Sequence, residues 1–289
     1  MRKDFCTSAD THAIIGKPIS HSLSPIIYNT LYDHYKLPYR CRTFCVPENE
    51  LSFFLYCAKA NGIGFLNVTS PYKMAVLPLL DYLSDSALQY GSVNTITTHN
   101  GLRGYSTDAQ GFLHSLHKIS LCDQDILLLG AGGAATTIAV CAAQNKARSI
   151  TLLCPTIAHA QAICKKIHLE INLNIECNYG NFEEINRYAA NAGLVINATP
   201  LGMSGYSDFN DLSFVDYLPQ NATVYDIVYS PAQTSLLLHA QKRDLKTIGG
   251  IEMLIHQAFA AFEIFHEISP TAEDMINVRS VLRQIDYPL

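Results

Sequence analysis

Charge is scarce in this chain of 289 residues, and positive charge is not in excess. Charged residues make up 16% of the sequence and the formal net charge is -5, so the basic surface that nucleic-acid binding requires is missing. The same balance gives no attraction to an anionic membrane. Hydrophobic residues make up 48%, the opposite of a disordered composition. We therefore expect one large or two medium folded domains.

Long apolar segments and paired cysteines are also missing. Residues 1–16 contain no apolar stretch of signal-peptide length, so we expect no secretion. The longest apolar run, residues 127–143, holds three glycines and is too short to span a bilayer. The nine cysteines include no C-x-x-C pair. We expect no disulfide framework and no metal site, but free thiols in a reducing cytoplasm.

What the sequence does contain is an alternation of short apolar runs with helical patterns. Ser24 is expected to cap the first helix, with Pro25 at its first position. A hairpin is expected to turn at Asn100–Gly101. The first part of the chain is thus predicted to hold strands at 11–16, 39–46 and 63–69, helices at 24–36 and 50–60, and the hairpin at 93–106.

A second series begins at residue 107. A helix is expected at 107–118, capped by Thr107 or Asp108. Continuous β-rich runs bounded by helices argue for parallel sheets covered on both faces. Buried strands are predicted at 125–130, 149–154, 174–178, 194–199 and 223–229, with a further candidate at 246–250, and helices at 253–268 and 271–285.

The predicted fold class is therefore α/β with two domains. Residues 1–106 are expected to form an N-terminal α/β domain that binds substrate, onto which the C-terminal helices within residues 251–289 return. Residues 107–250 are expected to form a Rossmann-type, doubly wound dinucleotide-binding domain.

The stretch LLLGAGGAATT predicts where a dinucleotide would bind. It carries a G-x-G-x-x-A pattern between a strand and a helix. The first glycine permits a tight turn, and the second lets backbone approach a pyrophosphate at the helix N-terminus. The alternative is a glycine turn that only packs helix on strand. The predicted cofactor residues are Gly130, Ala131, Gly132, Gly133, Ala134 and Ala135.

The next predicted strand lacks the usual ribose-reading residue. It ends in Cys154, Pro155 and Thr156, none of them charged. An acidic residue at this place favours NAD, and a nearby arginine accommodates the extra phosphate of NADP. The thiol of Cys154 is expected to be a buried strand-end group rather than a reactive one.

Lys73 and Asp108 are the candidate pair for proton transfer. Lys73 lies just beyond a strand that ends in Asn67 and Thr69, where its amine could exchange a proton with a carbonyl or an alcohol. Asp108 lies at a helix start, where the helix dipole favours a carboxylate that could hold the lysine ammonium. The 35 residues between them do not by themselves bring them together. A surface lysine and an N-cap aspartate are the alternatives.

Eight collinear motifs give the chain a family resemblance. They are IGKPISHSLSP, GFLNVTSPYK, GSVNT, GYSTDAQG, GAGGAA, NATPLGM, DIVYSPAQTSLL and GGIEMLIHQAF. In this order they resemble the motifs of the shikimate dehydrogenase family over nearly the whole chain. The resemblance implies a reversible, NADP-linked reduction of 3-dehydroshikimate to shikimate in aromatic amino acid biosynthesis. It implies Lys73 as the acid/base group and Asp108 as its partner.

The resemblance also implies the remaining site residues, and it allows a homodimer. Ser22 and Ser24 could instead serve only as helix caps. The implied substrate residues are Ser22, Ser24, Asn67, Thr69, Lys73, Asn94, Asp108, Tyr229 and Gln257. Beyond the glycine loop, the implied cofactor residues are Cys154, Pro155, Thr156, Thr199, Met203, Ile227 and Gly250.

Departures from the family pattern leave the cofactor open. The family usually has Asn-Arg-Thr in place of residues 154–156, so a charge-assisted contact worth roughly 1.5–3 kcal/mol is missing. This predicts a weaker preference for NADP, by about 10- to 100-fold, and allows NAD, unless Lys165, Lys166 or another cation substitutes. Ser106 stands where the family has Asn, and Tyr28 where it has His.

Two alternatives to a shikimate dehydrogenase stay open. One is a sister enzyme that acts on quinate or an aminoshikimate. The other is a ligand-binding paralogue that keeps the fold without turnover; the missing arginine and Ser106 point towards it, and the intact Lys73 and Asp108 point away from it.

Overall fold

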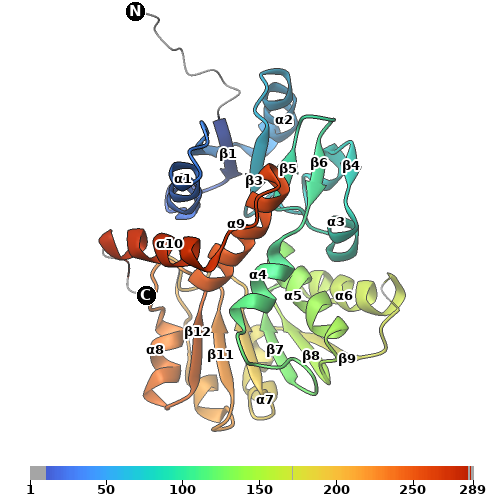
Figure 1. Ribbon diagram of the computed structural model, residues 1–289. Helices are drawn as coiled ribbons and strands as arrows, with labels where there is room; N and C mark the ends of the chain where they lie inside the picture. Colours follow the sequence, from blue (N-terminus) through green and yellow to red (C-terminus); the bar gives the residue numbers. More distant parts are fainter. Residues whose placement is uncertain (1–10, 171, 286, 288–289) are drawn as a thin grey trace, which may run out of the picture. The chain divides into compact units, whose positions relative to one another are not determined.

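The computed structural model describes residues 11–170, 172–285 and 287. The chain divides into two compact units, one formed by residues up to Thr107 together with those from Ile255 onward, and the other by Asp108–Leu254. Each unit has its own six-stranded sheet and its own hydrophobic core (Figure 1).

The first unit contains a mixed sheet in the order β2-β1-β3-β5-β6-β4. Its strands β1, β2 and β3 are parallel, whereas β5 is antiparallel to both β3 and β6. The predicted hairpin is confirmed as β5 and β6, and Gly101 in its turn has a φ of +89°. The strands are β1 (Thr11–Gly16), β2 (Arg40–Cys45), β3 (Phe65–Val68), β4 (Tyr82–Leu83), β5 (Thr95–Thr97) and β6 (Arg103–Tyr105).

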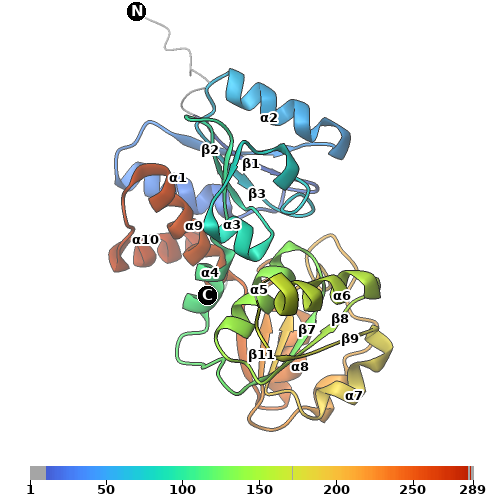
Figure 2. The ribbon, with the colours of Figure 1, turned by 90° about the vertical axis from the view of Figure 1, so that its right-hand side faces the viewer.

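Helices cover both faces of this sheet because successive side chains of a strand point to opposite sides. On β1, Ala13 and Ile15 pack with buried leucines of α2 (Leu51–Ala60). His12 points to the other face, where it meets aromatic rings of α1 (Ser24–His34) and α9 (Ile251–His266). The helix α10 (Ala272–Gln284) packs beside α1 (Figure 2).

The second unit contains an all-parallel sheet in the order β12-β11-β10-β7-β8-β9. With β7 as its first strand, this is the order of the Rossmann-type fold, so the predicted α/β class is confirmed. The strands are β7 (Asp125–Leu129), β8 (Ser149–Leu153), β9 (Glu176–Gly180), β10 (Leu194–Asn197), β11 (Thr223–Asp226) and β12 (Lys246–Gly249).

Helices of the second unit pack against this sheet. Leu127 and Leu129 of β7 share one core with buried residues of α7 and α8. The helices α5 and α6 contact strands β7, β8 and β9 (Figure 2). The helices of this unit are α4 (Asp108–Ser115), α5 (Gly133–Gln144), α6 (Ile157–Lys165), α7 (Ile185–Ala189) and α8 (Ser235–Lys242).

Several element boundaries differ from those expected. The N-cap of α1 is Leu23, so the prediction that Ser24 caps this helix was wrong by one residue. The helix α3 (Asp85–Tyr90) and strand β4 were not predicted. Both are too short to show a period, although Ser84 caps α3 and Gly91 ends it at a φ of +62°. None of the helices in the described part of the chain is long and apolar enough to cross a bilayer.

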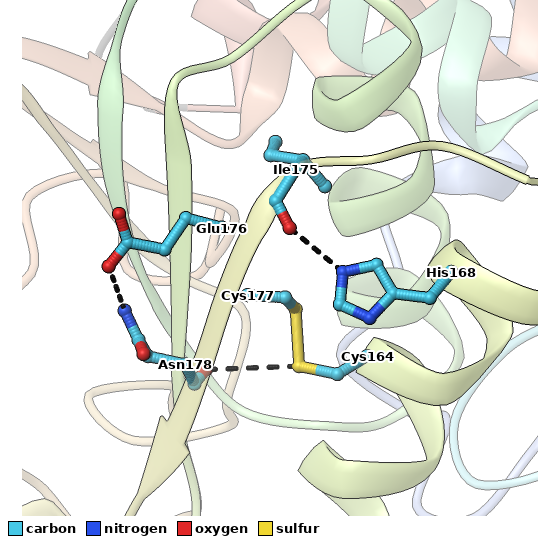
Figure 3. The surroundings of a disulfide bond; sticks show 6 residues. All are labelled: Cys164, His168, Ile175, Glu176, Cys177 and Asn178. Atoms are coloured by element: carbon cyan, nitrogen blue, oxygen red, sulfur yellow. Dashed lines mark hydrogen bonds between the residues drawn. A yellow bond between two sulfur atoms is a disulfide. The ribbon is translucent and has the colours of Figure 1, made fainter.

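One disulfide contradicts the expectation that the cysteines are free. Cys164 of α6 is bonded to Cys177 of the edge strand β9, with their Cα atoms 5.7 Å apart (Figure 3). Six other described cysteines are free thiols. The sequence could not indicate the bond, because its two sulfurs meet only when α6 packs on β9.

Reducing this disulfide should destabilise the second unit. The bond closes a loop of 13 residues, and a loop of this size is worth about 3 kcal/mol in the chain-entropy model. We expect Cys164→Ser and Cys177→Ser to lower the midpoint of thermal unfolding, and reductant to do the same to the unmodified chain. Cys122→Ser, at an exposed free thiol, is the matched control. An intact mass that shows two further thiols in the oxidised protein would contradict the bond.

Candidate active site

Polar side chains gather at the carboxyl ends of β1 and β3 in the first unit. The loops after the two strands are joined by backbone hydrogen bonds from Thr69 N to Ile15 O at 2.9 Å and from Lys17 N to Ser70 O at 3.2 Å. Gly16 makes this approach possible, because a Cβ there would overlap the side chain of Thr69. Thr69 is thereby held next to the start of the loop that carries the two serines.

Ser22 and Ser24 lie where this loop enters α1. The Ser22 hydroxyl oxygen accepts a hydrogen bond from Ser24 N at 3.3 Å, so Ser22 supports the start of the helix, as the capping alternative supposed. Its hydroxyl proton is still available to a ligand, since the contact uses only a lone pair. Ser24 is the first residue of α1 and is buried. A substrate contact of the two serines stays a prediction.

Asn94 and Gln257 meet although 163 residues separate them. The Asn94 amide donates to Gln257 Oε1 at 2.9 Å and to Thr107 Oγ1 at 2.8 Å. Its Oδ1 accepts from Thr107 N at 2.8 Å and from the Thr95 hydroxyl at 3.1 Å. Two of the predicted substrate residues are therefore brought together, and this explains how α9 is attached to its unit from Ile255 onward.

Asn67 joins the same cluster from β3. Its Nδ2 donates to Asn94 O at 3.0 Å and to Thr95 Oγ1 at 3.2 Å. Its Oδ1 lies 2.8 Å from Nε2 of His12, a residue that the sequence analysis did not single out. His12 stands inside an apolar strand, and only the pairing of β1 with β3 brings it to Asn67.

Lys73 and Asp108 belong to different units, and their pairing stays a prediction. Lys73 is half-buried in the turn after β3, and its carbonyl oxygen accepts from Val93 N at 2.8 Å. Asp108 is buried and is the first residue of α4, as expected. Ser106, in place of the family Asn, is buried with its hydroxyl 3.5 Å from that of Ser92.

The glycine loop lies between β7 and α5 in the second unit. Gly130 has a φ of +111°, its N donates to Leu153 O at 2.8 Å, and a Cβ there would come within 2.9 Å of Ala198 O. Gly132 is the N-cap of α5, and an added Cβ would meet no atom within 4 Å. Packing therefore demands glycine at 130 but not at 132, where the space suits a pyrophosphate.

The other predicted cofactor residues follow the ends of β10, β11 and β12. The Thr199 hydroxyl donates to Asn197 Oδ1 at 2.6 Å, and Met203 is half-buried in the turn beyond it. Ile227 N donates to Asn197 O at 3.0 Å. Gly250 packs so closely on the Ile227 carbonyl that no side chain fits there.

A buried carboxylate holds the loop after β11. Asp226 accepts from Asn197 Nδ2 at 2.9 Å, from Val228 N at 3.0 Å and from the Thr234 hydroxyl at 2.7 Å. Burial raises the pKa of Asp226 to about 6 in spite of these bonds. The loop carries Tyr229, a predicted substrate residue, which is half-buried.

The surroundings of Cys154, at the end of β8, are those expected for a buried thiol with a structural role. Cys154 is buried and its Sγ lies 3.1 Å from Thr156 O, while Pro155 and Thr156 are exposed. Lys165 ends α6 and Lys166 is its C-cap, about 13 Å along a helix of nine residues. Replacement of the missing arginine by either lysine stays a prediction. His159 is exposed in the first turn of α6 and is the only basic residue between 154 and 164.

Comparison with known proteins gives matches along both units. Residues 14–96 match the shikimate dehydrogenase substrate binding domain, residues 113–202 match shikimate / quinate 5-dehydrogenase, and residues 250–278 match the shikimate 5'-dehydrogenase C-terminal domain. A shikimate dehydrogenase (NADP(+)) of Alkaliphilus oremlandii is 37% identical over 89% of this chain and 91% of its own length.

Solved structures agree with these matches. A shikimate dehydrogenase in complex with NADP+ superimposes with a TM-score of 0.85 at 31% identity, covering 96% of each chain. A shikimate 5-dehydrogenase of Listeria monocytogenes in complex with shikimate and NAD gives a TM-score of 0.82 at 27% identity, covering 99% of each chain. The resemblance inferred from the motifs is thus confirmed, and this chain belongs to the shikimate dehydrogenase family.

Proposed function

We propose that the chain catalyses the reversible reduction of 3-dehydroshikimate to shikimate with NADPH, a step towards aromatic amino acids. The observation that carries the proposal is that family matches cover both a hydrogen-bonding cluster at the first sheet and a dinucleotide-type glycine loop on the second. The relatives match over nine-tenths of their length and are named as NADP(+) enzymes.

The proposed substrate residues suit the chemistry of shikimate, which carries one carboxylate and three hydroxyls. Hydroxyl groups of Ser22, Ser24, Thr69 and Tyr229 would hold the carboxylate. Amide and carboxylate groups of Asn67, Asn94, Asp108 and Gln257 would sort the ring hydroxyls. A site that bonds each hydroxyl rejects analogues that lack one, because its own polar groups are then left unpaired.

In the proposed reaction Lys73 handles the proton. NADPH, when bound at the glycine loop, supplies the hydride to the carbonyl carbon of the substrate. Lys73 donates a proton to the carbonyl oxygen, which becomes the alcohol, and takes that proton back in the reverse direction. Asp108 would hold the Lys73 ammonium in place by charge attraction. Domain closure would exclude water from the reaction.

The roles of the two domains are part of the proposal. Residues 1–106 with the helices of 251–289 would bind substrate, and residues 107–250 would bind the cofactor. A reducing cytoplasm is also proposed: the six free thiols among the described cysteines support it, whereas the Cys164–Cys177 disulfide is unusual there. A homodimer is also proposed, and the molar mass in light scattering checks it.

A substrate panel separates the alternatives. Quinate or an aminoshikimate as the better substrate would identify a sister enzyme. Ligand binding without turnover would identify the non-catalytic paralogue. Initial rates of shikimate oxidation with NADP and with NAD, each varied at saturating shikimate, therefore come first.

Removing the Lys73 amine should abolish most turnover. We expect Lys73→Ala and Lys73→Met to lower kcat by roughly 10²–10⁴-fold, because a positioned acid/base contributes that much. Shikimate binding, measured by calorimetry, should change less. Lys118→Ala removes an exposed lysine and is the control. Near-normal kcat in the Lys73 variants would rule out the proposed proton transfer.

The two glycines of the loop should respond differently to a methyl group. Gly132→Ala should leave thermal unfolding unchanged but weaken NADP binding by about 10-fold or more, because the open space at its Cβ would be taken from the pyrophosphate. Gly130→Ala should lower stability by about 1–3 kcal/mol, because its φ of +111° strains any other residue. If Gly132→Ala loses stability and keeps its affinity, the loop serves packing alone.

Restoring the family arginine should restore NADP preference. Pro155 is exposed, so Pro155→Arg should fold, and its guanidinium could pair with the 2′-phosphate. We expect the ratio of kcat/KM for NADP over NAD to rise by about 10- to 100-fold. Pro155→Gln is the uncharged control. An unchanged ratio in Pro155→Arg would mean that another group already holds the phosphate, and His159→Ala would test the basic side chain nearest in sequence.

A further inference from the structure

A chain of buried hydrogen bonds runs through the first unit from α1 to α9. The Tyr32 hydroxyl lies 2.8 Å from His12 Nδ1, and His12 Nε2 lies 2.8 Å from Asn67 Oδ1. Asn67 then donates to Thr95, which donates to Asn94, which donates to Gln257. His12 is wholly buried on β1. In this series of hydrogen bonds it connects Tyr32 of α1 to the amide of Asn67.

The direction of the bonds from Asn67 through His12 to Tyr32 is determined by one carbonyl. Asn94 O can only accept, and it receives bonds from Val68 N at 2.9 Å and from Asn67 Nδ2 at 3.0 Å. The Asn67 amide nitrogen must therefore face Asn94, which turns Oδ1 towards His12. His12 Nε2 must then carry the proton, and the unprotonated Nδ1 must accept from the Tyr32 hydroxyl.

The surroundings of His12 keep the imidazole neutral, as this arrangement requires. Its ring packs edge-on against Tyr28 at 4.3 Å and Phe265 at 5.1 Å between centroids. Burial, with a smaller contribution from the nearby His266, lowers the pKa of His12 to about 3, although the hydrogen bond to Asn67 acts in the opposite direction. A protonated ring would place a proton on Nδ1, against the Tyr32 hydroxyl proton.

We propose that His12 is a positioning residue for the substrate site: its Nε2–H, with the tautomer set by Tyr32, holds the Asn67 amide in one orientation. At the other end of this series of hydrogen bonds, Thr107 N donates to Asn94 Oδ1 and fixes the orientation of the Asn94 amide. Both hydrogens of Asn67 Nδ2 are engaged, so Asn67 can offer a ligand only a lone pair of Oδ1. The substrate group at Asn67 is therefore a hydrogen-bond donor, a hydroxyl of the ring.

The residue at position 28 fits this role of His12. Where the family has His, this chain has Tyr28, whose ring lies against His12. Its buried hydroxyl interacts with Asn67 without meeting hydrogen-bond geometry. Tyr28 therefore packs the imidazole without competing for either of its nitrogens. The His12 imidazole therefore keeps two hydrogen-bond partners, Asn67 and Tyr32.

The test compares three substitutions at His12 in the full chain. The inference rests on the proposed function, so wild-type turnover of shikimate is measured first and tests that function separately. His12→Phe removes both bonds, and we expect KM for shikimate to rise about 10-fold, with KM for NADP unchanged. His12→Gln keeps a donor near Nε2 and should stay within about threefold of wild type. His12→Asn, which cannot reach Asn67, should resemble His12→Phe.

Two controls separate positioning from packing. His266→Phe removes a half-buried imidazole that packs on Tyr32 and lies 3.5 Å from its hydroxyl but has no described bond to Asn67, and it should leave KM for shikimate unchanged. Asn67→Ala should raise KM, and adding His12→Phe to it should raise KM no further, because both act through one amide. Equal KM values in His12→Phe and wild type, or additive effects in the double variant, would overturn the proposal.

Discussion

The interaction on which the first unit most depends is the mutual saturation of buried amides. A buried amide that lacks a partner costs more than the bond would contribute, so each donor must find an acceptor. Asn94 meets this demand with four side-chain bonds and thereby ties β5 to Thr107 and to α9. The cluster that attaches α9 is thus built from the same side chains that are proposed to sort the ring hydroxyls.

The second unit differs, because its proposed cofactor contacts at the glycine loop would be made largely by backbone. Glycine at 130 is needed for the turn and glycine at 250 for the close packing of neighbouring strand ends. Gly132 is needed for neither, which agrees with the proposed role of this position in cofactor binding. The buried side chains of Asp226 and Asn197 hold the loops at the strand ends.

The sequence predicted the parts of the molecule that depend on local pattern. Buried parallel strands such as β7 and β10 are continuous apolar runs, and the glycine loop carries its own signal. The element α3 was missed because six residues show no period. The disulfide was missed because it needs α6 to lie on β9, and His12 because its partner is chosen by the register of β1 against β3. Contacts of this kind depend on tertiary packing, which a pattern in one segment does not contain.

Two of the three departures from the family pattern differ in what they can disturb. The loss of arginine at position 155 removes a charge from an exposed strand end, where nothing in the fold depends on it. Tyr28 instead stands in a fully buried aromatic core, and a change there must be matched by its neighbours. His12 is such a neighbour, since it supplies an imidazole whose two nitrogens are both used. The proposed phosphate contact at position 155 can therefore be restored by one surface substitution, whereas a substitution at Tyr28 also affects the buried side chains that are proposed to bind substrate.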